Sequence, residues 1–301
     1  MTFNLKRTGS AVAVAAALAA AFASAPASAV TLVGLTSTAQ LVTFDSSTPT
    51  AVLPSAVISG LLAGENIVSI DYRNPDNTIY GLGSLGNLYS LNATTGVATA
   101  TGATGLIPAT AAGVTYEVDW NPNNNNLRII GNSAAPNSNR AFTFSTGVTA
   151  VQTALTRADA GGPLNIVGAA YNNNALGAAA ATLSLFYIDA NSDALFSNTN
   201  AFGGGVLTKV ADLSLGGASF GINSQTGFDI ASTGEAFVAI GENLYSLNLG
   251  TGALANQGSI GPNFTVIGLT SLAPVPETQT YALMLAGLAA IGFVARRRTL
   301  R

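Results

Sequence analysis

"LYSLN" occurs twice in identical letters, at residues 88–92 and again at residues 244–248. Looser copies stand at residues 41–45 ("LVTFD"), 141–145 ("AFTFS") and 185–189 ("LFYID"). Turn-forming residues separate the copies, and the starts recur about every 50 residues, a period typical of repeat architectures. The pentapeptide is therefore predicted to be one strand of a unit that the chain builds several times.

The clearest unit surrounds the first copy of the pentapeptide. Residues 67–73 ("IVSIDYR"), 78–84 ("TIYGLGS") and 97–102 ("VATATG") join residues 88–92 as four short runs rich in β-branched and aromatic residues. Clusters of Asn, Asp, Pro and Gly separate the runs, as expected for strands joined by tight turns. The same order returns between residues 116 and 155 and between residues 227 and 260.

A more degenerate unit lies between these repeats. Its first strand is predicted at residues 166–172 and its second in an Ala-rich stretch near residues 177–182. Residues 185–189 are then the third strand and residues 207–213 the fourth. A last unit forms only if the two ends of the chain meet, with residues 264–270 ("FTVIGLT") as its first strand. Its other three strands come from the N-terminal side, at residues 30–36, 41–45 and 50–58.

Both faces of the pentapeptide strand are apolar or small in every copy, so both faces should be covered. A blade packed between two other blades meets this requirement, whereas a half-exposed strand of an open sandwich should alternate more cleanly. The sequence therefore predicts an all-β fold: a β-propeller of about five four-stranded blades, its ring closed by N- and C-terminal strands.

Composition excludes several classes of site. The chain has no Cys and no His, so Cys- or His-based zinc sites, His-ligated haem, Ser–His–Asp triads and thiol nucleophiles are ruled out. Between residues 30 and 274 thirteen acidic residues face five basic ones, a net charge of about −8. Such a core repels phosphate backbones, which argues against nucleic acid as a partner.

The N-terminal residues 1–29 have the pattern of a secretory signal peptide. Lys6 and Arg7 supply a positive start, residues 11–23 are apolar, and Ala27 and Ala29 frame an A-x-A cleavage site. The alternative is a membrane anchor, for which about 13 apolar residues are too few.

The C-terminal residues 275–301 form a second predicted targeting segment. A short motif precedes an apolar run at residues 281–295, and an arginine cluster follows. The run covers about 22 Å as a helix, short of a bilayer's hydrocarbon core, and the arginines would hold its end in the cytoplasm. The residues predicted to direct processing at this end are Val275, Pro276, Glu277, Thr278, Arg296, Arg297 and Arg298.

This tail resembles the PEP-CTERM sorting signal of Gram-negative bacteria, with Thr278 in place of the second proline. The resemblance implies a short transmembrane helix, recognition by an exosortase-type membrane peptidase, and release to the cell surface or surrounding matrix. It also associates the protein with exopolysaccharide and biofilm. The alternative is a plain C-terminal anchor.

The core between residues 30 and 271 is similar to a bacterial family of secreted repeat proteins, domain of unknown function 4394. The resemblance is carried by "GLLAGENIVSIDYR" (residues 60–73), "IYGLGSLGNLYSLNATTG" (residues 79–96) and "VDWNP" (residues 118–122). It implies no biochemical activity.

Three carboxylates are candidates for chemistry. Asp71, Asp119 and Asp229 share one place late in the first strand of their units, where the other two units have Ala170 and Gly268. If that strand lines a central channel, the carboxylates could bind a cation or a sugar, or act as general acid and base on a glycosidic bond. Alternatively, each Asp caps the turn that follows it.

Two weaker signals complete the candidates. Residues 189–193 begin like a calcium loop but lack its later Gly and Glu, so a turn is expected there. Trp120 lies near other aromatic and basic residues, which could stack on sugar rings or simply pack within blades. That neighbouring set comprises Tyr72, Arg73, Tyr116 and Arg128.

The sequence favours an exported, non-enzymatic protein that binds or scaffolds matrix components. Its expected partners are the secretion machinery, an exosortase-type peptidase and exopolysaccharide, with membrane contact only through the tail. No cofactor is expected, and calcium stays open as a ligand. The alternatives are a glycan-active hydrolase or lyase that uses the three carboxylates, and a purely structural surface protein.

Overall fold

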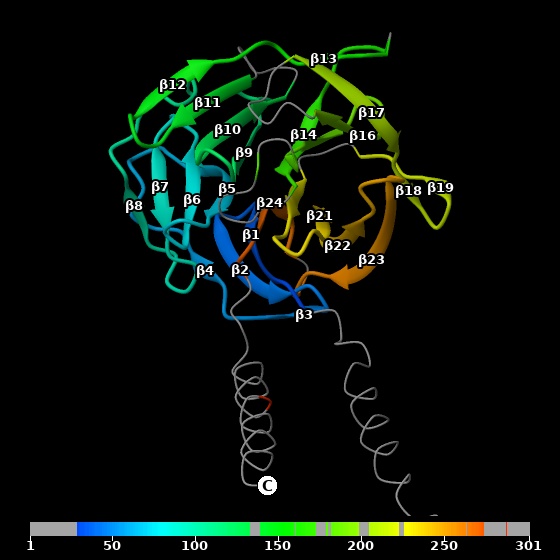
Figure 1. Ribbon diagram of the computed structural model, residues 1–301. Helices are drawn as coiled ribbons and strands as arrows, with labels where there is room; N and C mark the ends of the chain where they lie inside the picture. Colours follow the sequence, from blue (N-terminus) through cyan, green and yellow to red (C-terminus); the bar gives the residue numbers. More distant parts are fainter. Residues whose placement is uncertain are drawn as a thin grey trace, which may run out of the picture.

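The fold is a five-bladed β-propeller (Figure 1). The computed structural model describes residues 29–132, 139–159, 161–172, 179, 182–198, 205–222, 226–262, 264–273 and 287. Five antiparallel sheets stand around a common axis, and each sheet is one blade. The all-β propeller predicted from the repeats is confirmed.

Blades 1 to 4 are each built from one continuous part of the chain. Blade 1 consists of β5 (Ile67–Arg73), β6 (Thr78–Gly83), β7 (Leu88–Leu91) and β8 (Ala98–Ala100). Blade 2 consists of β9 (Tyr116–Trp120), β10 (Asn126–Gly131), β11 (Asn139–Thr143) and β12 (Val148–Val151). Blade 3 consists of β14 (Ile166–Tyr171), β15 (Leu185–Asp189), β16 (Ala194–Asn198) and β17 (Val206–Asp212). Blade 4 consists of β20 (Gly227–Ile230), β21 (Ala236–Ile240), β22 (Asn243–Leu247) and β23 (Ala253–Ser259).

The remaining blade joins the two ends of the chain and is called the closing blade. Its strands are β24 (Val266–Ser271), β1 (Thr31–Thr36), β2 (Gln40–Asp45) and β3 (Thr48–Val52), and β4 (Ala56–Val57) also pairs with β2. β1 pairs with β24 antiparallel from Leu32 opposite Ser271 to Leu35 opposite Gly268. The predicted closure of the ring by N- and C-terminal strands is therefore confirmed.

The innermost strand of each blade faces the axis. β24, β5, β9, β14 and β20 pack in that order, and β20 returns to β24, so each lies against the inner strands of both neighbouring blades. This ring positions the candidate site, because side chains on these strands meet at the axis.

Apolar side chains fill the space between every pair of neighbouring blades. Leu32 packs toward blade 4 and Val33 toward blade 1, although they are adjacent in β1. Successive strand residues point to opposite faces, so both faces of a blade are buried. This explains why the pentapeptide strands are apolar on both sides.

Blade 3 differs from its prediction. The stretch at residues 185–189 is the second strand, β15, which pairs directly with β14, and the third strand is β16. Residues 177, 178, 180 and 181 of the predicted Ala-rich strand lie outside the described residues, and Ala179 and Thr182 belong to no strand. The error has a physical cause: second and third strands are both buried on both faces, so "LFYID" fits either place.

The predicted strand at residues 50–58 is also divided. β3 ends at Val52 and β4 begins at Ala56, with Pro54 between them. Proline has no backbone N–H to donate to a ladder, so the strand breaks there.

Short parallel segments cover the outer edges of three blades. Ser59 bridges Val97 beside β8, β13 (Thr156–Arg157) pairs with β17, and β18 (Ser214–Leu215) pairs with β23. β18 also forms a small hairpin with β19 (Ala218–Ser219). Each segment leads into the blade that it covers, so the chain itself occupies edges that would otherwise be open to pairing.

The two predicted targeting segments, residues 1–29 and 275–301, lie largely outside the described residues. Of residues 1–29 the structure describes Ala29, which is exposed, and of residues 274–301 it describes Gly287. Within the part of the chain that is described, no helix combines the length and apolarity needed to cross a membrane. The signal peptide and the transmembrane tail remain predictions.

Candidate functional site

Three carboxylates converge on the propeller axis. Asp71 in β5, Asp119 in β9 and Asp229 in β20 each place an oxygen within 4.8 Å of the others. All three side chains are buried, with exposed fractions of 2%, 2% and 1%. The structure thus brings together the three residues singled out in the sequence, but in the interior of the ring and not in an open cleft.

Hydrogen bonds between blades define the equivalent positions. Asp71 Oδ2 accepts the backbone N–H of Trp120 at 2.6 Å, and Asp229 Oδ2 accepts that of Ser271 at 2.5 Å. The carboxylate of Asp119 accepts the backbone N–H of Tyr171. In each case the donor is the residue after the equivalent position on the next blade.

The same pattern corrects the assignment of the closing blade. Its equivalent position is Thr270, not Gly268, because Thr270 Oγ1 accepts the backbone N–H of Tyr72 at 2.9 Å. The Thr270 hydroxyl also donates to Asp71 Oδ1 at 2.9 Å. The fifth position of the ring is Ala170, whose methyl group offers no oxygen.

The alternative prediction of turn caps is wrong. Asp71 Oδ1 and Asp229 Oδ1 accept the N–H groups of the next residues, Tyr72 and Ile230, both at 2.7 Å, and their other oxygens bind a neighbouring blade. Turn caps would bind N–H groups two or three residues further along the chain. These aspartates instead fasten one inner strand to the next.

Burial and mutual repulsion act on the charge of the cluster. Burial raises the pKa of Asp71 well above its usual value, and the charge of Asp229 raises it further. Burial also raises the pKa of Asp119, with added repulsion from Asp71 and Asp229, and burial raises the pKa of Asp229. Two like charges at this separation repel by about 3 kcal/mol at an effective dielectric constant near 20. Three bare carboxylates are therefore unfavourable here, and a proton or a cation is needed.

A second layer of polar residues lies one step along the same strands. Ser69 and Glu117 stand two residues before Asp71 and Asp119, and both are buried. Ser69 Oγ accepts the backbone N–H of Val118 at 3.2 Å and donates to Glu117 Oε2 at 3.4 Å. The sequence analysis missed this layer. The signal was available, because Ser69 in "SID" and Glu117 in "EVD" precede the aspartates by two residues, and residues two apart in a strand lie on the same face.

Trp120 is part of the packing between blades 1 and 2. Its exposed fraction is 2%, and its ring meets Tyr80 edge-on at a centroid distance of 5.2 Å and Phe144 at 5.5 Å. The Arg73 guanidinium lies 5.3 Å from the ring centroid. The ring is therefore part of the core and presents no sugar-stacking face.

Two further residues of that predicted set are also engaged within the ring. Tyr116 and Arg128 are buried. Arg128 Nη1 donates to Asn139 Oδ1 at 3.2 Å, and its Nε donates to the Tyr171 hydroxyl at 3.4 Å. The predicted aromatic and basic cluster is thus divided among blade interfaces.

The turn at residues 189–193 is confirmed as a turn. Asp189 Oδ1 accepts the backbone N–H of Asn165 at 2.6 Å, and Asp193 Oδ1 accepts that of Ile222 at 2.7 Å. Asp189 Oδ2 also accepts the hydroxyl of Ser192 at 2.5 Å. These carboxylates hold neighbouring loops in place.

The identical pentapeptides line two open grooves at equivalent places. The blade-4 groove has a volume of about 670 Å³ and the blade-1 groove about 610 Å³. Ser246, Leu247 and Asn248 line the first, and their counterparts Ser90, Leu91 and Asn92 line the second. The grooves flank the closing blade, which contributes residues to both of them.

The two asparagines shape the grooves in the same way. Asn248 Oδ1 accepts the N–H groups of Gly250 and Thr251 at 2.9 and 3.1 Å. Asn92 Oδ1 accepts those of Thr94 and Thr95, both at 3.0 Å. Each asparagine closes the hairpin below its groove, so the repeated letters produce a repeated surface.

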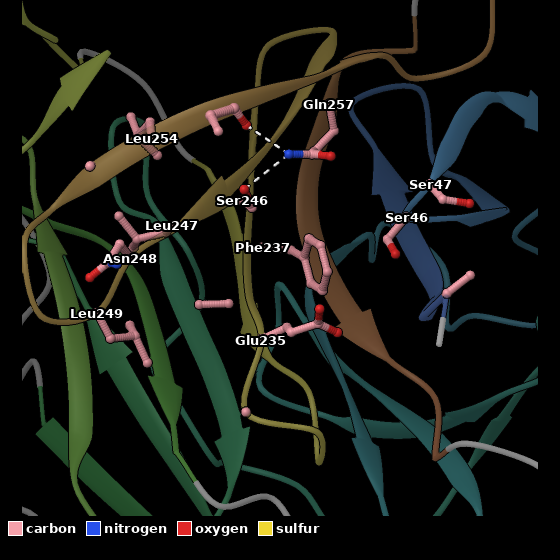
Figure 2. Close-up of a pocket in the computed structure, with 15 residues that line it drawn as sticks. Ser46, Ser47, Glu235, Phe237, Ser246, Leu247, Asn248, Leu249, Leu254 and Gln257 are labelled. Atoms are coloured by element: carbon pink, nitrogen blue, oxygen red, sulfur yellow. Dashed lines mark hydrogen bonds between the residues drawn. The ribbon is translucent and has the colours of Figure 1, made fainter. Parts of the chain in front are cut away.

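Figure 2 shows the blade-4 groove, with Ser46 and Ser47 of the closing blade on one side and Ser246 and Phe237 on the other. Gln257 Nε2 bridges the wall by donating to Ser246 Oγ at 3.0 Å and to the backbone oxygen of Ala255 at 3.2 Å. The lining therefore combines hydroxyl and amide groups with an apolar floor. The sequence did not reveal these grooves, because they depend on how blades meet.

The residues predicted to direct processing cannot be placed in the same way. Ala29 is exposed just before β1 and lines the blade-4 groove. The others lie outside the described residues, namely Ala27, Val275, Pro276, Glu277, Thr278, Arg296, Arg297 and Arg298.

Comparison with solved structures gives distant similarities of mixed kinds. A protein of unknown function from Bacteroides thetaiotaomicron is 12% identical with a TM-score of 0.48, covering 70% of this chain and 54% of its own. This chain therefore spans about half the length of that protein. A gluconolactonase from Xanthomonas campestris is 12% identical with a TM-score of 0.40, covering 78% of each chain. YCF48 from Cyanidioschyzon merolae is 10% identical with a TM-score of 0.37, covering 65% and 57%.

Comparison at the level of sequence is more specific. A search of curated proteins finds no match. The family model described as "Domain of unknown function (DUF4394)" matches residues 40–270, which include the three axial aspartates and both pentapeptides. The chain therefore belongs to the DUF4394 family.

Proposed function

We propose that this protein is an exported, non-enzymatic component of the cell surface or extracellular matrix that binds exopolysaccharide. The observation that carries the proposal is the pair of equivalent grooves beside the identical pentapeptides. The predicted signal peptide and sorting tail supply the export route, with an exosortase-type peptidase as the processing partner.

The groove chemistry suits a neutral glycan. Sugar hydroxyls both donate and accept hydrogen bonds, and the linings offer Ser, Thr, Asn and Gln groups that do the same. Acidic residues outnumber basic ones by thirteen to five between residues 30 and 274, and Glu235 lines the blade-4 groove. An acidic polymer would therefore be repelled, and neutral chains are favoured.

Two grooves on one ring also suit a polymer. A long glycan repeats the same unit, so one chain can occupy both grooves, and the second contact then forms at a high effective concentration. Weak binding in each groove is thereby strengthened without a deep pocket.

The non-enzymatic character is supported by the axial aspartates. Each is at most 2% exposed and holds backbone N–H groups of a neighbouring blade. General acid–base catalysis needs a carboxyl group within hydrogen-bond reach of the substrate. These residues support a structural role better than a catalytic one.

The test uses full-length protein and two soluble probes, a neutral cello-oligosaccharide and acidic alginate. Thr99 and Ala255 stand opposite Ser90 and Ser246 in the two ladders, and each lines one groove. Replacing them in T99W and A255W should fill the grooves, so each single variant should weaken binding of the neutral probe and the double variant should abolish it.

The matched control is Ala150 of blade 2, which stands opposite Ala141 and lines neither groove. Ala141 pairs through Arg128 with Asp119, just as Ser90 pairs through Tyr80 with Asp71. The A150W variant should bind like the unmodified protein. Unchanged binding by the double variant, or equal binding of alginate and the neutral probe, would overturn the assignment to these grooves. Cell fractionation with and without residues 275–301 tests the export route, since an unchanged location would contradict sorting by the tail.

A further inference from the structure

We propose that Asp71, Asp119 and Asp229 hold one calcium ion on the propeller axis. The site is independent of the two grooves and would act within the ring. Its candidate ligands come from three different blades, so a bound ion would tie these blades together.

The spacing of the carboxylates suits calcium. Calcium binds oxygen at about 2.3–2.6 Å, so two ligands on opposite sides of the ion are about 5 Å apart. One oxygen from each aspartate lies within 4.8 Å of the others. Magnesium binds oxygen at about 2.0–2.1 Å, so two ligands on opposite sides of it are about 4.2 Å apart at most. Carboxylate oxygens 4.8 Å apart would have to move closer together to bind magnesium.

One oxygen of the cluster is left without a donor. Asp119 Oδ1 is buried and has no hydrogen-bond partner among the described residues, in a side chain that is 2% exposed. The carboxylates of Asp71 and Asp229, in contrast, accept N–H groups at both oxygens. Buried carboxylate oxygens are normally satisfied by a donor or a cation, so the free oxygen of Asp119 marks the place of a missing partner.

Among the residues that the structure describes, no ion pair joins the cluster to a basic side chain. The ion pairs found there join Arg73 to Asp76, Arg157 to Asp159 and Asp189, and Lys209 to Asp212. The three axial aspartates take part in none of them. Buried charges are usually paired or bound to a metal, and a divalent cation would supply the charge that the protein itself does not.

The position of the single tryptophan offers a direct probe. Trp120 follows Asp119 in β9, and its backbone N–H binds Asp71. Terbium is a luminescent substitute for calcium, and it emits when a nearby excited tryptophan transfers energy to it. Because the chain has one tryptophan, sensitised emission reports a lanthanide near this part of the ring.

The experiment uses the full-length chain. Since the carboxylates are buried, the protein is unfolded and refolded in chelator, then refolded in parallel with calcium, magnesium or terbium. We expect saturable terbium emission that calcium displaces. We also expect Tm to rise by about 5–10 °C when calcium exceeds Kd by about 100-fold, with a smaller rise in magnesium.

The variant D119N removes one candidate ligand charge and should abolish both the emission and the calcium-dependent rise in Tm. The control is D76N, because Asp76 bonds Arg73, which lies over the Trp120 ring. A surface lanthanide near the tryptophan would be lost in D76N, whereas the axial ion would be kept.

Two results would overturn the proposal: no calcium-dependent change in Tm for the unmodified chain, or full retention of that change in D119N. If D119N fails to fold, D229N tests the same site. Failure of both variants to fold leaves the unmodified chain decisive, since its Tm and terbium emission must still respond to calcium. Glycan binding by the grooves is measured separately, so either proposal can fail alone.

Discussion

The carboxylate of Asp71 accepts the backbone N–H of Trp120 on the neighbouring blade, with 2.6 Å between Oδ2 and N. The other oxygen of Asp71 accepts the N–H of Tyr72 and the hydroxyl of Thr270. One side chain therefore fastens blade 1 to blade 2 and to the closing blade. The axial aspartates are, first of all, parts of the ring's structure.

Replacing this side chain should destabilise the ring. In D71A, the Trp120 N–H and the Thr270 hydroxyl lose their buried acceptor, while the Tyr72 N–H keeps Thr270 Oγ1. We expect the free energy of unfolding to fall by about 2–5 kcal/mol. Relief of repulsion does not offset this loss, because a proton or cation already reduces the repulsion in the native protein. Urea unfolding followed by tryptophan fluorescence measures the change.

The control for this prediction is D212A, since Asp212 is exposed and pairs with Lys209 at the surface. A surface pair of this kind contributes about 0–1 kcal/mol. Equal effects of D71A and D212A would contradict the role given to Asp71.

A second buried carboxylate organises blade 1. Glu65 Oε2 accepts the Tyr89 hydroxyl at 2.5 Å and Asn87 Nδ2 at 2.8 Å, while Oε1 accepts the backbone N–H of Leu85 at 3.0 Å. E65Q keeps the shape but sets an amide N–H₂ against donors. We expect it to lose about 1–3 kcal/mol of stability at pH 7, measured by urea unfolding.

The same residue predicts a pH dependence. Burial alone would raise the pKa of Glu65, but the hydrogen bonds from Tyr89, Asn87 and Leu85 hold it below its ordinary value of 4.5. The folded state then binds fewer protons than the unfolded state, so this stabilisation is present above pH 4.5 and is lost as pH falls through the lowered value. The difference in stability between the unmodified protein and E65Q should therefore shrink below pH 4.5, and a constant difference would contradict this origin.

Gly83 is constrained by the same carboxylate. A Cβ at this position would collide with Glu65 Oε1, so G83A should displace Glu65 and destabilise blade 1. In an E65A background the obstacle is gone, and the cost of G83A should fall by about 1 kcal/mol or more.

The comparison for this prediction is G162A, because a Cβ on Gly162 meets nothing within 4 Å. It should change stability by less than about 0.5 kcal/mol. Additive costs of G83A and E65A would show that the two residues do not compete for the same space.

Closure of the ring gives a fifth prediction. Ending the chain before residue 264 removes β24, which exposes the edge of β1 and the flanks of β5 and β20. We expect this shorter chain to lose cooperative unfolding and to aggregate, as seen by circular dichroism and size-exclusion chromatography. Ending the chain after residue 273 keeps β24 and should preserve the cooperative transition.

The repeats made much of the fold predictable. The identical pentapeptides set the period, and apolar residues on both strand faces distinguished a packed blade from an open sandwich. Blade 3 was assigned incorrectly because "LFYID" fits a second strand as well as a third. Only the pairing of Leu185 with Tyr171 shows its place.

The candidate site was predictable only in part. Three aspartates at one position in related strands pointed to the axis. The equivalent position in the closing blade, Thr270, was not predicted, because only its hydrogen bond to Tyr72 in another blade identifies it. The two grooves could not be predicted for a similar reason. Their walls come from residues as distant in sequence as Ser46 and Ser246, and nothing in either local stretch records that they meet.

The junction of β1 and β24 also determines where the ring is mechanically weakest. Leu272 donates its backbone N–H to Thr31, so the two ends of the propeller leave from neighbouring points on one blade. A force on either end acts first on the pairing between β1 and β24. The four continuous blades bear the force only after this pairing has broken. Force applied through the C-terminal end would therefore begin by peeling β24 away from β1, and tension would open the ring at this junction before any other.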